Sequence, residues 1–536
     1  MIIALSQLNS TVGDLAGNAA LINNAIQRAK NDANILVFPE MVLTGYPTKD
    51  LIFDLDFIDS AYDTLLEISK NVFDIVVLVG FVRRENDKIY NSVAIMQSGK
   101  IIGFRDKTLL PNYDVFDERR YFSPAKKIEP VNIELNGDNI RLGVQICEDL
   151  WDDDYSLKVS DVLINQGVDM IINLSASPFH VHRIKDRIEK VRRKVRKSNT
   201  PYIYCNSIGY QEELVFDGQS FVMNADGNII SLAKAFKEDF IIADISYQND
   251  NESFNILDKY DELFMALSLG VKDYFSKTNH SRAVIGLSGG IDSALTAAIA
   301  AEAIGPQNIV GVAMPSKFSS NHSIRDAELL SFNLGLDFEI IKINDINNQF
   351  LDVLDSILDT SNPGLAEENL QARIRGNILM TIANKERALL LNTGNKTELA
   401  LGYCTLYGDM CGALSVIGDL NKNEVYELAR WINKKQNKEI IPESSLSKPP
   451  SAELSYNQVD PFDYEIVSPL VDEIVTNGCN INKLVELGYD YELCKEIMHK
   501  IRVFEYKRYQ SAPVIRVSKK AFGVGRRLPI INQYKV

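Results

Sequence analysis

The sequence predicts an α/β protein of two domains, a layered α/β domain followed by a doubly wound parallel sheet. Three observations lead to this prediction. The chain has 536 residues, whereas a single hydrophobic core rarely extends beyond about 250 to 300 residues. Its first half contains many short β-branched runs with helical stretches between them, and its second half alternates strand and helix. The composition, 46% hydrophobic and 24% charged, is that of a globular protein and excludes disorder of the whole chain.

The first half opens with an apolar run, IIALSQLN, and continues through further runs rich in β-branched residues, which we expect to be strands. These runs are ANILVFPE (33–40), DIVVLVGFV (74–82), YNSVAIMQSGKIIGF (90–104), RLGVQIC (141–147), DMIINLSAS (169–177) and TPYIYCNSIG (200–209). Ser98 and Gly99 predict a hairpin turn within the run over 90–104. Apolar residues at helical spacing predict helices over 18–32 and 183–199.

A polar, acidic segment, SYQNDNESFN (246–255), follows a predicted hairpin over 215–236 and has few residues that could form a core. We therefore expect a first domain at 1–247, a linker at 248–262 and a second domain at 263–536. The second half then alternates strands and helices, which predicts a parallel, doubly wound sheet. Its elements are a helix over 258–276, AVIGL (283–287), SALTAAIAAEAIGP (293–306), NIVGVAMP (308–315), a helix near 322–334 and FEIIKIN (338–344).

The charge balance indicates small or soluble partners. The 57 basic and 72 acidic residues give a net charge of −15, which argues against a protein that neutralises a nucleic-acid backbone. No stretch of 18 residues lacks charged residues, and no basic segment precedes the short apolar start. We therefore expect no membrane partner and a cytoplasmic location. The six cysteines contain no C-x-x-C pair, which argues against a disulfide framework and a structural zinc site.

One motif in the second half has the features of a phosphate-binding loop. The segment GLSGGIDS, Gly286–Ser293, joins an apolar strand directly to an alanine-rich helix. Glycines let the backbone approach a ligand closely, and the free N–H groups of a helix N-terminus favour an anion. Asp292 would repel phosphate unless Mg²⁺ lies between them, so a metal–nucleotide complex suits the loop better than phosphate alone. The alternative, a glycine turn with a helix cap, explains the paired glycines together with both serines less well.

This loop resembles the S-G-G-x-D-S loop of the ATP pyrophosphatase family, whose members split ATP between its α and β phosphates and adenylate a substrate. Together with the segments 388–430, SKPPSAEL (447–454) and EYKRYQSAP (505–513), it resembles the NAD synthetases. The resemblance implies a Rossmann-like sheet of the adenine nucleotide α-hydrolase type. The residues implied to bind ATP are Gly286, Leu287, Ser288, Gly289, Gly290, Ile291, Asp292, Ser293 and Thr393.

The same resemblance implies that Asp292 and Glu398 hold Mg²⁺ and that Asn369, Glu398 and Lys507 contact deamido-NAD. Each residue alone has a simpler explanation, such as a solvated charge for Lys507 or a helix-surface position for Asn369. The prediction depends on their joint order and spacing. Two further residues, Asp409 and Lys422, are additional candidate contacts.

Three residues of the first half lie where strands are expected to end. They are Glu40 after ILVFP, Lys107 in GFRDKTLLPNYDVFDERRYF and Cys147 in LGVQICEDLWDD. A cysteine at a strand end is well placed to be exposed and activated as a nucleophile. No histidine lies nearby in the sequence, so a carboxylate is the expected base, and Lys107 could balance the thiolate and stabilise an oxyanion. The alternative is that Cys147 is a buried small hydrophobic residue and Glu40 a simple strand-end charge.

In the contexts FPE, K-x-x-L-P-N-Y and C-E-D-x-W, these residues resemble the Glu, Lys, Cys triad of the carbon–nitrogen hydrolase (nitrilase) superfamily. The resemblance implies an α-β-β-α sandwich in which Glu40 is the general base, Lys107 the oxyanion stabiliser and Cys147 the nucleophile. Glu118 matches a further glutamate often found between the lysine and the cysteine. The positions that match glutamine-binding residues are Tyr113, Ser177 and Arg183.

The two sets of motifs together resemble the glutamine-dependent NAD synthetase family over nearly the whole chain. That resemblance implies that ammonia released from glutamine passes through the protein to a second site, where ATP has adenylated deamido-NAD, and displaces AMP to give NAD. The implied partners are glutamine, ATP with Mg²⁺, deamido-NAD and further copies of this chain in a homo-oligomer. The alternatives are another ATP-dependent amidotransferase, or an amidase whose C-terminal half senses nucleotides.

Overall fold

The computed structural model describes residues 1–135, 137–247, 254, 256–358, 364–456 and 458–534. The chain forms two compact units, Met1–Leu257 and Asp258–Val536. Part of the predicted linker, residues 248–253 and 255, lies outside the described residues, and its last residues begin helix α5 (Lys259–Lys277). Within the described ranges, no helix combines the length and the apolar character needed to cross a lipid bilayer.

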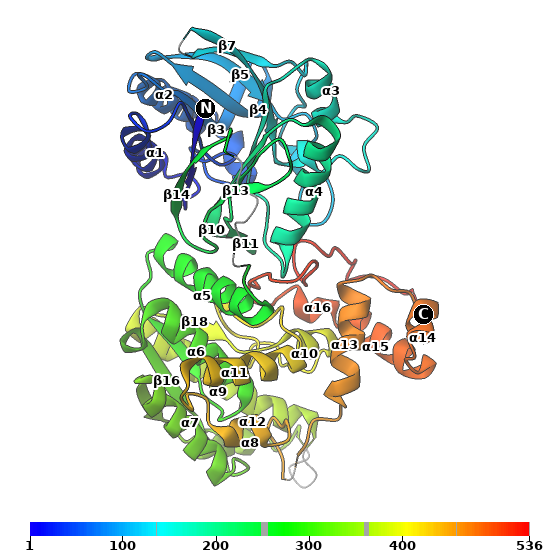
Figure 1. Cartoon of the computed structure of the whole chain (residues 1–536). Coiled ribbons are helices and arrows are strands. Elements are labelled where there is room, and N and C mark those ends of the chain that lie inside the picture. The colour runs from blue at the N-terminus through cyan, green and yellow to red at the C-terminus, as the bar shows by residue number, and fades with distance from the viewer. Residues whose placement is uncertain (136, 248–253, 255, 359–363, 457, 535–536) are drawn as a thin grey trace. The chain divides into compact units, whose positions relative to one another are not determined.

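The first unit is a sandwich of two six-stranded sheets with helices on the outer faces (Figure 1). The first sheet contains, in spatial order, β14 (Asp239–Asp244), β1 (Ile2–Gln7), β2 (Ile35–Val37), β3 (Val76–Glu85), β4 (Lys88–Gln97) and β5 (Lys100–Asp106). The second contains β13 (Ile229–Leu232), β12 (Phe221–Met223), β9 (Tyr202–Asn206), β8 (Met170–Ser175), β7 (Asp138–Ile146) and β6 (Val131–Leu135). The predicted α-β-β-α sandwich is thus confirmed.

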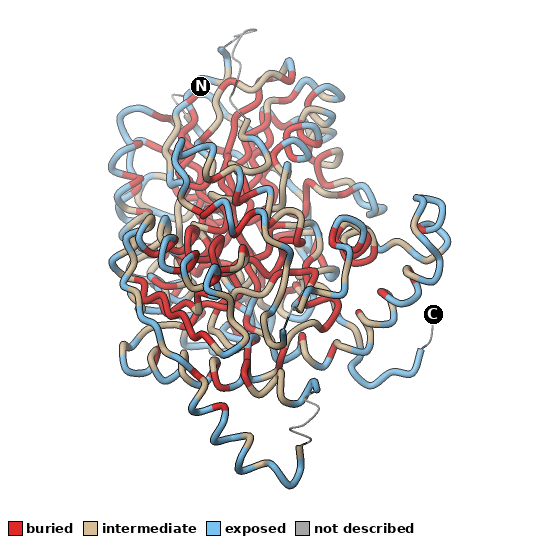
Figure 2. The backbone as a smooth tube through the Cα atoms, turned by 90° about the horizontal axis from the view of Figure 1, so that it is seen from below, coloured by how far each residue is buried: buried red, intermediate tan, exposed pale blue. Residues whose placement is uncertain are grey.

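Hydrophobic side chains fill three layers of this unit. Leu5 of β1 and Val144 of β7 belong to the core between the sheets, whereas Ala4 faces the outer helices. Successive side chains of a strand point to opposite faces, so a strand covered on both faces is apolar throughout. This explains the unbroken apolar run at the start of the chain; the buried strands are red in Figure 2. The helices that cover the sheets are α1 (Leu15–Ala29), α2 (Leu55–Ser69), α3 (Val159–Asn165) and α4 (Arg183–Ser198).

The predicted hairpins of the first unit are present. Ser98 and Gly99 have positive φ angles of 53° and 74°, as a tight turn between β4 and β5 requires. Strands β12 and β13 pair antiparallel within the predicted hairpin over 215–236, and a further two-stranded hairpin joins β10 (Ile208–Gln211) and β11 (Leu214–Asp217). Helix α2 and strand β6 were not predicted. The buried residues of α2 lie at helical spacing, so the signal was present in the sequence.

The second unit contains a five-stranded sheet in which every neighbouring pair is parallel. This arrangement confirms the predicted doubly wound sheet. The order is β17 (Asp337–Ile340), β16 (Ile309–Ala313), β15 (Ala283–Gly286), β18 (Leu389–Asn392) and β19 (Leu414–Ser415). The chain builds outward from β15 in one direction and then returns to add β18 on its other side. Ligands of open α/β sheets bind at such a reversal, beyond the carboxyl ends of the strands.

Helices surround this sheet and form most of the rest of the unit. Helix α6 follows β15 and is buried from Ser293 to Ala300, so its alanines allow close packing. Helix α9 packs over β15 and β18. The helices are α6 (Ile291–Ile304), α7 (Asn321–Leu334), α8 (Asn344–Val353), α9 (Leu365–Glu386), α10 (Lys396–Leu401), α11 (Lys422–Gln436), α12 (Glu443–Ser447), α13 (Tyr464–Val475), α14 (Ile481–Glu486), α15 (Tyr491–Val503) and α16 (Glu505–Arg508).

Two parts of the second unit differ from the expectation. Helix α9 was not predicted, because its apolar residues do not gather in a single stripe and so give no helical periodicity. The stretch 388–430 was expected to be rich in loops after its first strand, but it contains α10, β19 and the start of α11. Asn395 and Asn421 cap these two helices by accepting hydrogen bonds from Glu398 N and Glu424 N.

Candidate active sites

Three predicted residues of the first unit converge on one buried point. Glu40 follows β2, Lys107 follows β5 and Cys147 follows β7. The Lys107 Nζ atom lies 2.8 Å from Glu40 Oε1 and also 2.8 Å from Glu118 Oε1. The charges of Glu40 and Lys107 both act on the pKa of the Cys147 thiol, so the cysteine belongs to the same group. Cys147 is 6% exposed, which contradicts the expectation of an exposed thiol.

The backbone around these residues has the geometry that the site needs. Cys147 has a φ angle of 40°, a left-handed conformation that non-glycine residues rarely adopt, and it begins a short 3-10 helix, Cys147–Leu150. The sharp turn directs the chain away from β7 at the cysteine. On the other side, a Cβ atom on Gly80 of β3 would lie 2.4 Å from Met41 N. Glycine is therefore required at position 80 for the Glu40 segment to pack against β3.

Hydrogen bonds hold both glutamates in place. Asn91 Nδ2 donates to Glu40 Oε1 over 2.7 Å, and Ala176 N donates to Glu40 Oε2 over 2.8 Å. The Tyr46 hydroxyl donates to Glu118 Oε1 over 3.1 Å. Both carboxylates are almost fully buried, so these donors replace water. Asn91 and Tyr46 were not predicted, because neither residue type signals such a role in a sequence.

Burial and charge together set the protonation of this group. Burial raises the pKa of Glu118 to about 7; Lys107 acts against this increase and Glu40 adds to it. Burial acts to lower the pKa of Lys107, but Glu118 and Glu40 outweigh it, so the ammonium form persists. Burial and Glu40 hold the pKa of Cys147 well above its ordinary value, while Lys107 lowers it. The thiol therefore needs a neighbouring base to lose its proton.

The charge of Cys147 acts on the pKa of two of the three predicted glutamine contacts, Tyr113 and Arg183, so both lie near the cysteine. The Tyr113 hydroxyl donates to the two carboxylate oxygens of Glu148, 3.0 and 3.1 Å away. Ser177 Oγ accepts from Arg187 Nε at 3.4 Å. The Arg183 guanidinium stacks 3.9 Å above the Trp151 ring, and its Nε atom is buried without a hydrogen-bond partner among the described residues.

Two supporting residues were missed because a sequence does not reveal side-chain partners. Arg187 is fully buried, and its Nη1 atom lies 2.8 Å from both carboxylate oxygens of Asp217. The Arg187 Nη2 atom also donates to Ser177 O over 2.8 Å. This buried ion pair therefore fixes the position of the predicted glutamine contact Ser177.

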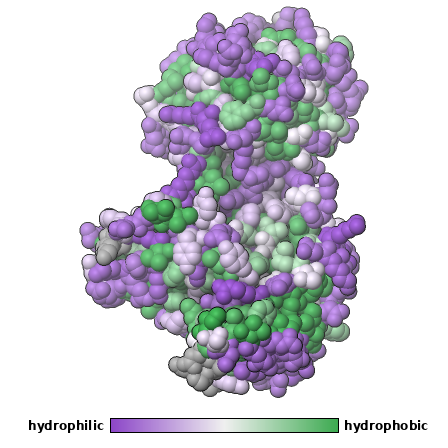
Figure 3. Space-filling model, turned by 180° about the vertical axis from the view of Figure 1, so that it is seen from behind, coloured by the Kyte–Doolittle hydropathy of each residue, from purple (hydrophilic) through white to green (hydrophobic). Residues whose placement is uncertain are grey.

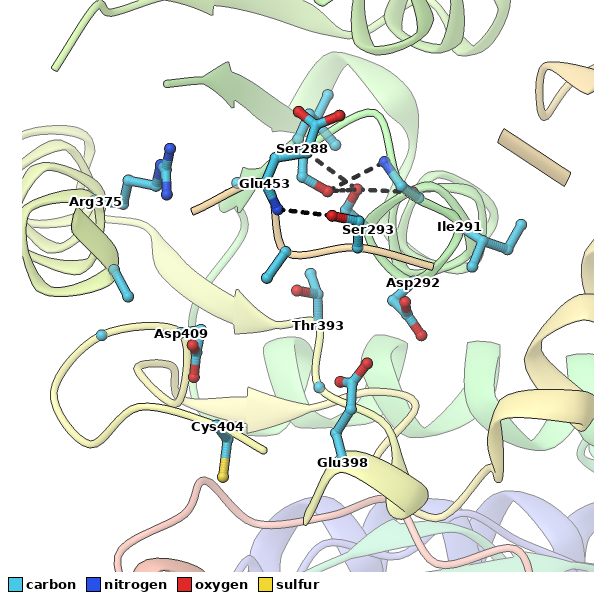
Figure 4. Close-up of a pocket in the computed structure, with 18 of the residues that line it drawn as sticks. Ser288, Ile291, Asp292, Ser293, Arg375, Thr393, Glu398, Cys404, Asp409 and Glu453 are labelled. Carbon is cyan, nitrogen blue, oxygen red and sulfur yellow. Dashed lines mark hydrogen bonds between the residues drawn. The ribbon is translucent and has the colours of Figure 1, made fainter. Parts of the chain in front are cut away.

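The second unit contains a cavity of about 310 Å³ beyond the carboxyl ends of β15, β16 and β18 (Figure 4). Thr393 and Glu398 line it together with most of the predicted phosphate loop. Gly289 does not line it. This glycine has a φ angle of 74°, and a Cβ atom there would lie 2.1 Å from Ser323 O. Its role is to let the loop pass close to α7.

The phosphate loop is held by hydrogen bonds within itself. Ser288 N donates to Ser293 Oγ over 3.3 Å, and Ser293 Oγ donates to Gly290 O over 3.0 Å. Gly290 N donates to Ser288 Oγ over 3.1 Å. The loop leads directly into α6, whose N-terminal N–H groups favour an anion in the cavity.

A lysine lies between the two predicted magnesium ligands. Lys422 Nζ is 2.5 Å from Asp292 Oδ2 and 3.2 Å from Glu398 Oε1. Asn395 Nδ2 donates to Asp292 Oδ1 over 2.9 Å. Burial raises the pKa of Glu398 to about 7, although Lys422 acts against this increase. Burial acts to lower the pKa of Lys422, but Asp292 and Glu398 outweigh it and raise it overall.

These two carboxylates suit Mg²⁺ in the presence of a nucleotide. No group of three or more His, Cys, Asp or Glu side chains that could hold a metal occurs in the described part of the chain. Magnesium usually takes one or two carboxylates and completes its octahedron with substrate phosphates and water. Asp292 and Glu398 both line the cavity beside the phosphate loop, so the residues present fit such a site.

Two predicted deamido-NAD contacts do not line this cavity. Asn369 Oδ1 accepts a hydrogen bond from Thr405 Oγ1 at 2.7 Å. Lys507 Nζ donates to Gly402 O at 2.8 Å and to Cys404 O at 2.6 Å. Both residues therefore hold the loop 402–405, of which Tyr403 and Cys404 line the cavity.

Other charged residues line the cavity as well. Burial raises the pKa of Asp409, an additional candidate, to about 6. Burial lowers the pKa of Arg375, which was not predicted, to about 10. Glu453 lies in the segment SKPPSAEL (447–454) but was not predicted as a site residue. Its carboxylate accepts hydrogen bonds from Ser320 N over 3.2 Å and from Ser323 Oγ over 2.6 Å. Its charge within a segment that already resembles the NAD synthetases is the signal that could have identified Glu453.

Comparison with known protein families separates the chain into the same two parts. The carbon-nitrogen hydrolase family matches residues 2–249, and the NAD synthase family matches residues 263–511. Fold and sites thus define a class of protein in which an amide-hydrolase domain precedes a nucleotide-dependent synthase domain.

Full-length relatives make the assignment specific. The glutamine-dependent NAD(+) synthetases of Synechocystis sp. and Thermotoga maritima are 41% and 39% identical to this chain, with 99% of both chains covered in each case. A solved glutamine-dependent NAD+ synthetase from Acinetobacter baumannii, in complex with adenosine diphosphate, has a TM-score of 0.79 and 35% identity and covers 99% of this chain and 98% of its own. The structure from Cytophaga hutchinsonii, 22% identical with a TM-score of 0.84, covers 99% of this chain and 98% of its own and supports the fold. The chain belongs to the glutamine-dependent NAD(+) synthetase family.

Proposed function

We propose that this chain makes NAD from deamido-NAD, ATP and glutamine. Hydrolysis of glutamine in the first unit yields glutamate and ammonia. In the second unit, the nicotinate carboxylate of deamido-NAD attacks the α phosphate of ATP, which gives an NAD-adenylate and releases pyrophosphate. Ammonia then attacks the activated carbonyl carbon, and AMP leaves. The division of labour follows the predicted boundaries, with residues 1–247 as glutaminase and 263–536 as synthetase.

In the glutaminase step, Glu40 accepts the proton of the Cys147 thiol, and the sulfur attacks the side-chain amide carbon of glutamine. The Lys107 ammonium stabilises the oxyanion that forms. Glu40 returns the proton to the leaving nitrogen, ammonia departs and a glutamyl thioester remains. Water, deprotonated by Glu40, then hydrolyses the thioester and regenerates the thiol. The high pKa of the buried thiol supports this scheme, because the sulfur needs a base within the buried group.

Around the cysteine, we propose that Arg183 pairs with the α-carboxylate of glutamine. Its buried Nε atom has no hydrogen-bond partner among the described residues, so a ligand carboxylate would satisfy it. Tyr113 and Ser177 would complete the glutamine site.

In the synthetase step, the proposed ATP site is the loop Gly286–Ser293 with Thr393. The loop serines and the N–H groups at the start of α6 bind and orient the phosphates. Asp292 and Glu398 would hold Mg²⁺, which would neutralise charge on the departing pyrophosphate. Lys422 is then free to turn from the carboxylates toward the phosphates. We propose that Asn369 and Lys507 act on deamido-NAD by shaping the loop 402–405.

A single observation carries the proposal, namely that one chain contains both a buried Glu, Lys, Cys group and a phosphate-loop cavity at the sheet reversal. The test is NAD formation by Cys147→Ala with glutamine or with ammonium as nitrogen donor. Glutamine-dependent synthesis is expected to fall by about a thousandfold or more, whereas ammonium-dependent synthesis is retained.

Cys205→Ala is the matched control, since Cys205 is also buried, in strand β9 of the same sheet as β7, but lies outside the group. It is expected to keep both activities. Equal loss of both activities in Cys147→Ala would refute the division of labour. Glutamine hydrolysis without NAD formation in the wild type would instead favour an amidase with a nucleotide-sensing module.

We also propose that the chain assembles into a homo-oligomer. In support, the second unit exposes several large apolar side chains, and Figure 3 shows apolar areas on the surface of this unit. Such surfaces commonly form protein interfaces. The exposed side chains include Phe332 of α7, Val353 of α8, Leu365 of α9 and Ile357, which lies in the turn after α8. The mass measured by light scattering tests this: a monomer at micromolar concentration would contradict it.

A further inference from the structure

Asp149, two residues after Cys147, is fully buried and has no part in the scheme above. Its two carboxylate oxygens contact two different segments. Oδ2 accepts a hydrogen bond from Ile146 N at 3.1 Å. Oδ1 accepts from Leu109 N at 2.8 Å and from Thr108 N at 3.1 Å. One oxygen therefore holds the turn that bears the cysteine, and the other holds the segment that directly follows Lys107.

These two segments belong to different sheets of the sandwich. Lys107 follows β5, at the edge of the first sheet, whereas Cys147 follows β7 in the second. No strand ladder joins β5 to β7, so their spacing depends on side chains. Arg105 supplies a second link, because its Nε donates to Val144 O over 3.2 Å and its Nη2 donates to Thr108 Oγ1 over 2.6 Å. The positive charge of Arg105 also opposes the rise that burial causes in the pKa of Asp149.

We propose that Asp149 is a positioning residue that sets the distance between the Lys107 ammonium and the Cys147 sulfur, an inference that rests on the proposed glutaminase function. The lysine lowers the pKa of the thiol and would stabilise the oxyanion, and both effects depend on this distance. A displacement of about 1 Å at a reacting centre costs about a hundredfold in rate. The Oδ2 bond also holds the backbone N–H of Ile146, which directly precedes Cys147, and the φ angle of 40° at Cys147 is unfavourable for a non-glycine residue.

The substitution Asp149→Asn tests the link with little change in shape. It turns one acceptor oxygen into an NH₂ donor that must face a backbone N–H donor, so one of the two segments loses its partner in either orientation. The kcat for glutamine hydrolysis is expected to fall about a hundredfold, with the KM for glutamine and the ammonium-dependent NAD synthesis unchanged. Asp149→Ser, which keeps one small acceptor, serves if the first variant folds poorly, and an intermediate loss is expected.

The control is Asp152→Asn. Asp152 is equally buried in the same segment but pairs with Lys194 of α4 at 2.8 Å instead of with the lysine segment. The decisive readout is the pH dependence of Cys147 alkylation by iodoacetamide, followed by mass spectrometry. The alkylation profile is expected to shift to higher pH in Asp149→Asn because the Lys107 ammonium would lie farther from the thiol, and to stay in place in Asp152→Asn.

Either of two results for Asp149→Asn would overturn the proposal and leave Asp149 with a structural role only. One is an unchanged kcat per reactive Cys147, and the other is an unshifted alkylation profile together with a lower thermal midpoint. Wild-type protein that hydrolyses no glutamine would refute the proposed function itself, which separates the two failures.

Discussion

Replacement of Gly289 by alanine tests how closely the phosphate loop approaches α7. The φ angle of 74° is a left-handed conformation, which costs alanine about 1 to 2 kcal/mol. The added Cβ would lie 2.1 Å from Ser323 O and 2.8 Å from Ser323 Cα, so backbone must move on one side. Such overpacking costs about 1 to 3 kcal/mol. We expect the second unit to lose about 2 to 5 kcal/mol of stability and the loop to shift by about 1 Å.

The shift is expected to slow adenylation about a hundredfold, because the phosphates would no longer meet the N-terminus of α6 correctly. The assay is pyrophosphate release from ATP and deamido-NAD with ammonium as donor, alongside thermal unfolding. Glutamine hydrolysis by the first unit provides an internal reference and is expected to stay unchanged.

Gly335→Ala is the matched control. Gly335 ends α7 with a φ angle of 78°, but no atom lies within 4 Å of the position of an added Cβ. Gly335→Ala is therefore expected to lower the free energy of unfolding by the backbone strain alone, about 1 to 2 kcal/mol, without a steric clash. If Gly289→Ala matched Gly335→Ala in both stability and pyrophosphate release, the steric reasoning would be refuted.

Three further predictions concern charge and metal. Burial raises the pKa of Glu118 to about 7 from its ordinary 4.5, so the contribution of Glu118 to stability is fully present below pH 4.5 and is lost as the pH rises through 7. In urea unfolding, the free energy of unfolding of the wild type relative to that of Glu118→Gln should fall over this range, and a constant difference would contradict this. Lys422→Met leaves Asp292 and Glu398 without their shared cation and should lower the free energy of unfolding by about 3 kcal/mol. Addition of Mg²⁺ alone should restore part of the loss in thermal midpoint, and no response to Mg²⁺ would count against the proposed metal site. Removal of Mg²⁺ with EDTA should stop NAD formation from both donors but leave glutamine hydrolysis intact, and continued NAD formation would disprove the metal requirement.

Much of both sites could be predicted because their residues lie in local patterns. Glu40, Lys107 and Cys147 each follow a strand, which is a signal that the sequence carries locally, although β5 and β7 lie in different sheets. The run Gly286–Ser293 between an apolar strand and an alanine-rich helix likewise indicates a phosphate loop through its glycines and its helix start. These features depend on short-range backbone preferences and on strand or helix periodicity, which are present in any window of the sequence.

Other properties arise only when remote segments meet in the folded chain. Lys422 lies between Asp292 and Glu398, although the sequence around Lys422 indicates neither of these ion-pair partners. Cys147 is buried, contrary to the expectation of an exposed nucleophile, and burial together with Glu40 holds the pKa of its thiol well above its ordinary value. Asn369 and Lys507 support a loop instead of lining the cavity. Burial, pKa and side-chain partners depend on distances across the fold, so tertiary packing decides them, whereas the order of strands, helices and motifs is already present in the linear chain.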